Sequence, residues 1–113
     1  MKPGEVVLIR FPQTNLQSGK LRPALVIAIA PGRHDDVLLA LVSSRISQAI
    51  PNFDEIIHSN DPDYRVTGLK VASVVRISRL VTVESTIIDA RLGEISSDRL
   101  KRIKQHISDW LLS

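Results

Sequence analysis

The chain has 113 residues, with a hydrophobic fraction of 43% and a charged fraction of 24%, which indicates one folded domain over residues 1–113 and excludes a disordered chain. No apolar run approaches the roughly 18 residues of a membrane-spanning helix, so we expect a soluble, cytoplasmic protein without membrane association. The absence of cysteine excludes disulfides, thiolate nucleophiles and cysteine-rich zinc sites.

The net charge of +3 comes entirely from the first half of the chain. Residues 1–52 contain six Lys or Arg against three acidic residues, whereas the remainder contains nine of each. Such a basic surplus attracts phosphate groups or an acidic peptide through a field that salt screens. A chance surplus on a solvated surface explains the same count equally well.

The first half of the chain has the pattern of three strands. β-Branched and apolar residues predict a strand over residues 5–11, and the turn-forming residues of 12–20 predict a polar loop. Near-continuous apolar segments over residues 22–30 and 36–44 predict strands that are buried on both faces or form the wall of a barrel.

The second half contains less regular strand patterns. Between residues 45 and 68 only 54–58 have the pattern of a strand, and we expect the rest to be mostly loop. Residues 69–84 are long for one strand and polar residues interrupt them, which predicts a bent or bulged strand. Residues 85–93 predict a further short strand that ends at Gly93.

The C-terminal segment predicts an amphipathic helix. Ser96 or Ser97 can cap its first turn, where Asp98 also complements the helix dipole. An apolar stripe recurs at steps of three and four residues, at Leu100, Ile103, Ile107 and Leu111. Short strands followed by one helix, without βαβ alternation, predict a mainly β (α+β) fold with a small curled sheet or barrel.

Arg22 and Pro23 stand directly before the second apolar segment. Proline restricts Arg22 to extended backbone conformations and itself belongs at the start of a strand or on a sheet edge. A guanidinium group held in this way suits a phosphate. A surface arginine or one half of an ion pair is the simpler alternative.

Polar residues elsewhere at strand positions are further candidates. Ser43, Ser44 and Arg45 end the third predicted strand, where hydroxyl and guanidinium groups can bind a phosphate or simply begin a turn. Arg76 and Ser78 lie two residues apart, so in a regular strand both face the same side, which solvent exposure also explains.

The sequence contains no recognisable metal site or cofactor motif. The three histidines, His34, His58 and His106, are scattered, and none has a second histidine at ligand spacing. We find no P-loop, dinucleotide fingerprint or serine-histidine-acid grouping, and aromatic residues are too few to indicate a stacking platform. We therefore expect no metal and no cofactor.

Several segments together resemble the PemK/MazF family of toxins from bacterial type II toxin-antitoxin systems. They are, in chain order, PGEVVLIRFP, GKLRPALVI, LVSSRI, TGLKVASVVRISRLVTV and RLGEISSDRLKRI, which cover nearly the whole chain. The resemblance implies an SH3-like (CcdB/MazF-type) barrel that forms a homodimer. It also implies metal-independent cleavage of single-stranded RNA, in which the ribose 2′-hydroxyl attacks and leaves a 2′,3′-cyclic phosphate and a 5′-hydroxyl, and a co-encoded antitoxin with an acidic tail.

The resemblance also assigns candidate roles to individual residues. Arg22 matches the catalytic arginine of the family, and Ser43 stands where the family commonly has a hydroxyl residue that contacts the phosphate. Arg76 matches a second arginine of some members, as proton donor or phosphate clamp. Part of the family carries an acid two residues later, whereas this chain has Ser78, which cannot act as a carboxylate base.

The expected RNA contacts flank these positions. The loop over residues 12–20 should flank the RNA groove and adjust its specificity, with Gln13, Thr14 and Lys20 as its contacts. The complete set of expected RNA-binding residues is Gln13, Thr14, Lys20, Ser44, Arg45, Ser78 and Arg79. Two alternatives to the nuclease stay open at this point: an inactive module that binds RNA or an antitoxin, and a toxin that acts on gyrase.

Overall fold

The computed structural model describes residues 1–10, 20–32 and 35–113. Phe11, at the predicted end of the first strand, and the predicted RNA contacts Gln13 and Thr14 lie outside these ranges, as does His34. The elements in chain order are β1 (Glu5–Arg10), β2 (Leu21–Ile29), β3 (Asp36–Ser43), η1 (Ile46–Gln48), β4 (Glu55–Ile57), α1 (Tyr64–Thr67), β5 (Ser73–Glu84), η2 (Ser85–Ile87), β6 (Ile88–Glu94) and α2 (Ser97–Leu111).

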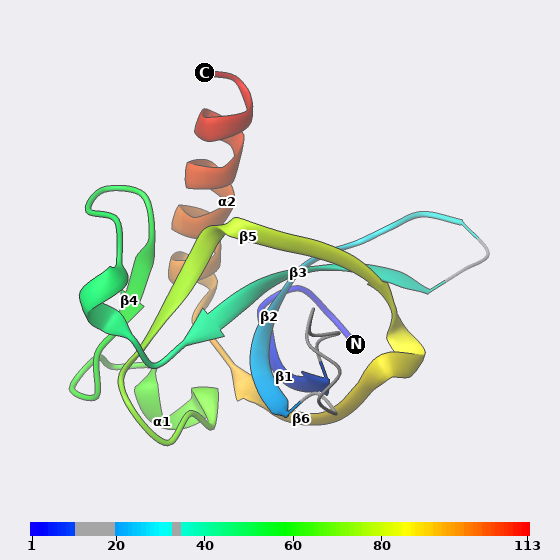
Figure 1. The fold of residues 1–113 in the computed structure, drawn as a ribbon, viewed down its shortest axis with the longest axis horizontal. Coiled ribbons are helices and arrows are strands. Elements are labelled where there is room, and N and C mark those ends of the chain that lie inside the picture. The colour runs from blue at the N-terminus through cyan, green and yellow to red at the C-terminus, as the bar shows by residue number, and fades with distance from the viewer. Residues whose placement is uncertain (11–19, 33–34) are drawn as a thin grey trace.

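The six strands form one antiparallel sheet in the order β4-β5-β3-β2-β1-β6. The sheet bends around a common centre, and α2 stands beside it (Figure 1). Three of the five pairings, β1–β2, β2–β3 and β4–β5, join strands that follow each other in the chain, as is common in antiparallel sheets. The prediction of a mainly β, SH3-like barrel with a C-terminal helix is confirmed.

Both faces of the sheet are buried, which explains why β2 reads as a continuous apolar run. Leu25 and Ile27 belong to a cluster that includes Ile103 of α2. Ala24 and Val26, which alternate with them along β2, belong to a second cluster whose buried members come from β1, β2 and β3. Partly buried residues of β5 and β6 pack against this cluster. The helix therefore covers one face of the sheet, while the other face closes on itself.

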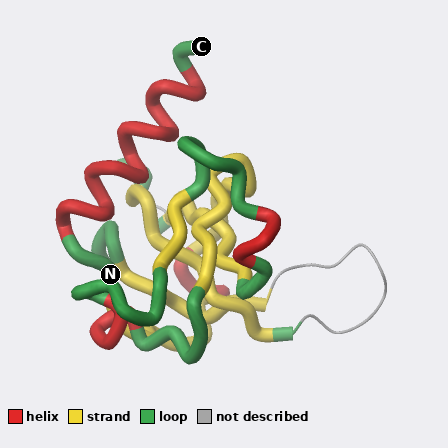
Figure 2. Tube along the Cα trace, turned by 90° about the vertical axis from the view of Figure 1, so that its left-hand side faces the viewer, coloured by secondary structure: helices red, strands yellow, loops and turns green. Residues whose placement is uncertain are grey.

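Helix α2 begins as predicted but is not packed along its whole length. The Ser96 hydroxyl accepts a hydrogen bond from the Arg99 amide at 3.2 Å, and Ile103 and Ile107 are buried. Leu111, the last position of the predicted stripe, is 67% exposed, so the expectation of packing is wrong there. The reason is visible in Figures 1 and 2, where the C-terminal end of the helix projects past the sheet. No helix in the described ranges is long and apolar enough to cross a membrane.

The bulge predicted in the long strand β5 is present. Leu41 of β3 lies opposite Arg76, but its neighbour Ala40 lies opposite Leu80. Residues 77–79 of β5 therefore have no counterpart on β3. The irregularity bends β5 and frees local backbone groups from the ladder.

The region from residue 45 to 68 is mostly loop, as expected, with β4 inside the predicted strand 54–58.

The four-residue helix α1, which the sequence did not predict, lies against β6 at two glycines. A Cβ atom on Gly68 would lie 2.2 Å from the Leu92 carbonyl oxygen, and one on Gly93 would lie 2.0 Å from that of Val66. Gly68 also has a φ of +72°, which favours glycine. The two segments therefore meet backbone against backbone.

A buried ion cluster ties the start of α2 to the segment before α1. The Arg99 guanidinium, 5% exposed, donates to both carboxylate oxygens of Asp63 at 2.9 Å, to Asp61 at 2.9 Å and to Glu55 at 3.2 Å. Asp63 also accepts from the Ser96 amide at 3.0 Å. The hydrogen bonds from Arg99 lower the pKa of Asp63 from 3.8 to about 2, against the opposing effect of burial.

Candidate functional site

Arg22 is the second residue of β2, at the end of the strand where its pairing with β3 has not yet begun. It lies opposite Ile9 of β1, whereas the first β2 residue that pairs with β3 is Ala24. The sequence predicts Pro23 at the first position of a strand or on a sheet edge. It is the third residue of β2, at a position that does not pair with β3. The missing amide hydrogen of Pro23 interrupts no β2–β3 pairing. The proline also restricts the exposed Arg22 to an extended backbone.

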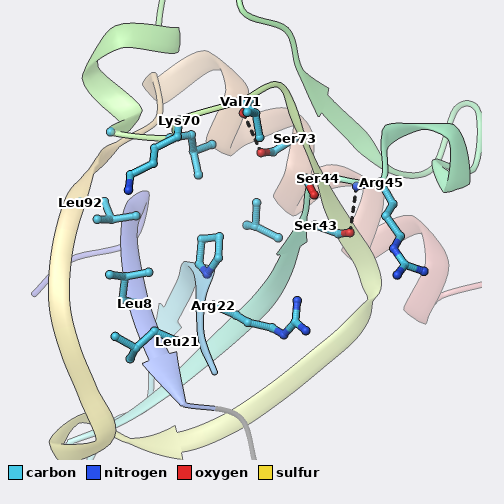
Figure 3. Close-up of a pocket in the computed structure, with 14 residues that line it drawn as sticks. Leu8, Leu21, Arg22, Ser43, Ser44, Arg45, Lys70, Val71, Ser73 and Leu92 are labelled. Carbon is cyan, nitrogen blue, oxygen red and sulfur yellow. Dashed lines mark hydrogen bonds between the residues drawn. The ribbon is translucent and has the colours of Figure 1, made fainter. Parts of the chain in front are cut away.

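A cavity of about 450 Å³ opens beside this strand end, and we call it the main cavity (Figure 3). Its cations are Arg22, Arg45 and Lys70, and no carboxylate of the described chain lines it. The remaining residues supply hydroxyl groups on one side and an apolar wall on the other. The full lining is Leu8, Leu21, Arg22, Pro23, Val42, Ser43, Ser44, Arg45, Gly68, Leu69, Lys70, Val71, Ser73 and Leu92. A basic rim next to an apolar wall suits an anionic ligand that also has apolar faces.

The hydroxyl of Ser43 is fixed at the end of β3. Its Oγ accepts a hydrogen bond from the Arg45 amide at 3.1 Å, and this contact is drawn in Figure 3. The hydroxyl proton remains available for donation, because this bond uses only an oxygen lone pair. Ser44 and Arg45 are exposed and line the same cavity. The structure thus brings together around one cavity four of the candidate residues, Arg22, Ser43, Ser44 and Arg45.

A second cavity of about 220 Å³, here called the side cavity, adjoins the first. Arg22 and Ser43 line both cavities, and Arg76 and Arg79 line the side cavity only. The β5 bulge is responsible for this arrangement, since Arg76 lies before it and Arg79 within it. Three guanidinium groups around one small space form a strongly positive site, which favours phosphate over a neutral ligand.

Two of the predicted contact residues line neither cavity. Ser78 is exposed in the bulge, and Lys20 is exposed just before β2. The inference that Arg76 and Ser78 face the same side assumes a regular strand, and the bulge removes that regularity. Ser78 is therefore not placed where the acid of a base-catalysed site would be needed.

Sequence reasoning missed two residues that line the main cavity, Lys70 just before β5 and Ser73 at the first position of β5. Ser73 is buried and donates its hydroxyl to the Val71 carbonyl at 2.9 Å. Sequence reasoning also missed Asp54, which is buried and has its Oδ2 atom 3.4 Å from the Nε atom of Arg76. The position of Lys70 directly after Gly68 and Leu69 is a signal that could have identified it. Nothing in the sequence indicates which strand Asp54 adjoins.

The histidines of the described chain lie outside both cavities. The Nδ1 atom of His106 is 2.7 Å from the Phe53 carbonyl oxygen, and His58 is exposed near Asp61. Within the described ranges, no three His, Asp or Glu side chains are grouped so that they could hold a metal ion. The chemistry offered by the two cavities is therefore positive charge and hydrogen-bond donation.

The sequence model of the PemK-like, MazF-like toxins of type II toxin-antitoxin systems matches residues 2–111. The chain belongs to this family. The match spans nearly the whole sequence, so the strands, the α1 region and α2 are all parts of the family domain. A search of curated protein sequences gives no match.

Solved structures of MazF toxins share the fold. MazF from Deinococcus radiodurans is 23% identical with a TM-score of 0.72, and the alignment covers 100% of this chain and 97% of that one. The Mycobacterium tuberculosis toxin MazF-mt6 is 14% identical with a TM-score of 0.69, covering 95% of each chain. An endoribonuclease in complex with its cognate antitoxin, from Mycobacterial species, is 16% identical with a TM-score of 0.65, covering 98% and 94%.

Proposed function

We propose that this PemK/MazF-family chain is a cytoplasmic, metal-independent endoribonuclease that cleaves single-stranded RNA. In this reaction the 2′-oxygen bonds to the adjacent phosphorus while the bond to the 5′-oxygen breaks. The products are a 2′,3′-cyclic phosphate and a 5′-hydroxyl. The observation that carries the proposal is the grouping of Arg22, Arg76 and Arg79 with the Ser43 hydroxyl around the side cavity.

These groups suit the charge that develops in the reaction. Two negative charges build up on the phosphorane oxygens, and donors held in place before the reaction stabilise them at little reorganisation cost. Arg22 and Ser43 line both cavities, so a chain running from one cavity to the other carries its phosphate past them. The apolar wall of the main cavity then accepts a base, and its basic rim contacts flanking phosphates.

The proton transfers are assigned by elimination among the described residues. No carboxylate or imidazole of the described chain lines either cavity, and of the residues outside the described ranges only His34 has an imidazole and none has a carboxylate. Arginine holds its proton at neutral pH because its pKa exceeds 12. We therefore assign Arg22 to charge stabilisation. Water or hydroxide removes the 2′-proton, and water returns a proton to the departing 5′-oxygen, which gives the 5′-hydroxyl end.

The test is incubation of the purified protein with a long single-stranded RNA in EDTA, followed by identification of the fragment ends. The matched pair of variants is Arg22→Ala and Arg65→Ala, since Arg65 is an exposed arginine on α1 that lines neither cavity. Cyclic phosphate and 5′-hydroxyl ends with the wild type and the Arg65 variant, but not with Arg22→Ala, support the proposal. Full activity of Arg22→Ala would remove Arg22 from the mechanism.

A binding module without catalysis is the second candidate function. The absence of a carboxylate or imidazole from the described lining of both cavities favours it. Wild-type protein that is folded and binds RNA tightly, yet leaves it intact in the same incubation, would establish this alternative.

We further propose that an antitoxin with an acidic segment occupies the main cavity. One of the similar structures is an endoribonuclease bound to its cognate antitoxin, and the rim of the main cavity is basic. Such a segment should compete with RNA for the cavity. An acidic peptide that inhibits RNA binding at low salt, and inhibits it less at high salt, would support the assignment.

We propose that the protein is a homodimer, and the exposed apolar side chains near the end of α2 support this. Leu111 and Leu112 are 67% and 83% exposed, and with Ile27 and Ala28 of β2 they line an apolar groove. Sedimentation at micromolar concentration should give about twice the chain mass, and Leu111→Ser should shift it toward the monomer. A wild-type monomer would contradict the proposal.

A further inference from the structure

Asp54 is a buried carboxylate beside an arginine of the proposed site. It directly precedes β4, and the pairing of Glu55 with Val75 places it next to Arg76. Its side chain is fully buried, with Oδ2 at 3.4 Å from the Nε atom of Arg76. Burying a charge in this way is costly unless every oxygen has partners, so its contacts show what the carboxylate supports.

The contacts of Asp54 hold the bulge of β5. Oδ1 accepts a hydrogen bond at 2.9 Å from the amide of Ile77, a residue that has no counterpart on β3. Oδ2 accepts another from the Ile50 amide at 2.9 Å, which closes the turn before β4. The carboxylate thus satisfies a backbone donor that the bulge would otherwise leave unpaired in the core.

The same carboxylate faces the inner side of the Arg76 guanidinium. Nε of Arg76 is buried and makes no hydrogen bond within the described structure, and Asp54 is its ion-pair partner there. The side chain is 17% exposed and lines the side cavity together with Arg22 and Arg79. Asp54 therefore lies behind Arg76, while the cavity lies in front of it.

We propose that Asp54 is a positioning residue that acts on RNA cleavage through Arg76. The inference rests on the proposed function and extends it. Asp54 fixes the bulge and opposes the charge of Arg76 from the buried side, so that the two Nη groups meet the phosphate in the side cavity. Asp54 does not replace the acid that is absent at Ser78, because a fully buried carboxylate that lines neither cavity cannot take a proton from the 2′-hydroxyl.

A double-mutant cycle on cleavage tests the proposal. Asp54→Asn keeps the size of the side chain but removes its charge and presents a donor toward Nε of Arg76. We expect kcat to fall about 10- to 100-fold, the effect of a misplaced catalytic group, with KM changing less. In the Arg76→Ala background the same substitution should lower kcat less than about twofold. An equal loss in both backgrounds would overturn the proposal, because the role would then be structural only.

The control is Asp61→Asn, which removes a carboxylate from the Arg99 cluster and leaves the cavities unchanged. All rates are measured well below the lowest melting temperature of the set. Asp61→Asn should leave kcat within about twofold of the wild type. If Asp61→Asn lowered kcat as much as Asp54→Asn does, kcat would follow the stability of the fold, and the proposal would be contradicted.

Two further measurements keep the proposal testable if Asp54→Asn does not fold or the wild type does not cleave. In the wild type, a single-stranded oligodeoxynucleotide should shift the Nη resonances of Arg76, while its Nε proton stays protected from exchange with water. Exchange of that proton as fast as at Arg79 would refute the placement of Asp54. If the wild type leaves RNA intact, the proposed nuclease function fails. The cycle is then measured as Kd for the oligodeoxynucleotide, where Asp54→Asn should weaken binding only when Arg76 is present.

Discussion

The substitution Asp63→Asn tests the buried ion cluster at the start of α2. Asp63 accepts two hydrogen bonds from Arg99 and one from Ser96, and an asparagine cannot accept all three in the same orientation. The fall of its pKa from 3.8 to about 2 corresponds to on the order of 2 kcal/mol of stability. Because one partner of a buried pair is lost, we expect the free energy of unfolding at pH 7 to fall by about 2–4 kcal/mol.

The pH dependence follows from the direction of the pKa change. The folded state lowers the pKa, so the contribution of Asp63 is complete above its unfolded pKa of about 4 and is lost as the pH falls through about 2. The difference between wild type and Asp63→Asn should therefore shrink by about 2 kcal/mol between pH 7 and pH 2. Urea unfolding followed by far-ultraviolet circular dichroism, at one protein concentration, measures it.

Asp89→Asn is the matched control, because Asp89 is an exposed carboxylate on β6. Its effect should stay within about 0.5 kcal/mol at every pH. If Asp63→Asn costs no more than this control, or if its cost is the same at pH 7 and pH 2, the reasoning about the ion cluster is refuted.

Four further predictions concern the site and the fold. Without a general base, kcat should rise about tenfold per pH unit between about pH 6 and 8, and a bell-shaped profile would indicate a titrating base. Arg22→Lys keeps the charge but loses the guanidinium fork, so kcat should fall about 100-fold while RNA binding, measured by fluorescence anisotropy, changes little; undiminished cleavage would contradict this. Lys70→Ala should reduce the slope of log K against log salt by about 0.7, one phosphate contact on a single strand, and an unchanged slope would remove Lys70 from the interface. Gly93→Ala should lower the free energy of unfolding by on the order of 3 kcal/mol, since its Cβ would lie 2.0 Å from the Val66 carbonyl oxygen, and an unchanged thermal midpoint would contradict the contact.

Local patterns predicted most of the elements. Apolar and β-branched runs correctly indicated β2 and β3, because a strand buried on both faces needs apolar residues at every position. The cap at Ser96 and the spacing of Ile103 and Ile107 indicated α2. These signals lie within one element, so they can be read without knowing its neighbours.

Features that depend on pairing between distant segments were not predictable in this way. Asp54 and Ile77 meet only because β4 pairs with β5, and no residue pattern near either one specifies that register. The exposure of Leu111 depends on where the sheet ends beneath the helix. The spacing of apolar residues within the helix gives no information about that point. Local pattern singled out Arg22 and Ser43 as candidates and the resemblance to the family assigned them roles, whereas their convergence on two shared cavities required the fold.

The backbone contacts of Gly68 with Leu92 and of Gly93 with Val66 fix one wall of the main cavity. Gly68 and Leu92 both line the main cavity, and the segments that carry them touch through backbone atoms that no side chain separates. The spacing of this wall is therefore set by peptide geometry, and a larger residue at either glycine would clash with backbone atoms of the other segment. Any redesign of the cavity for another ligand must act through lining side chains outside this contact, such as Leu21 of β2 and Val71 before β5.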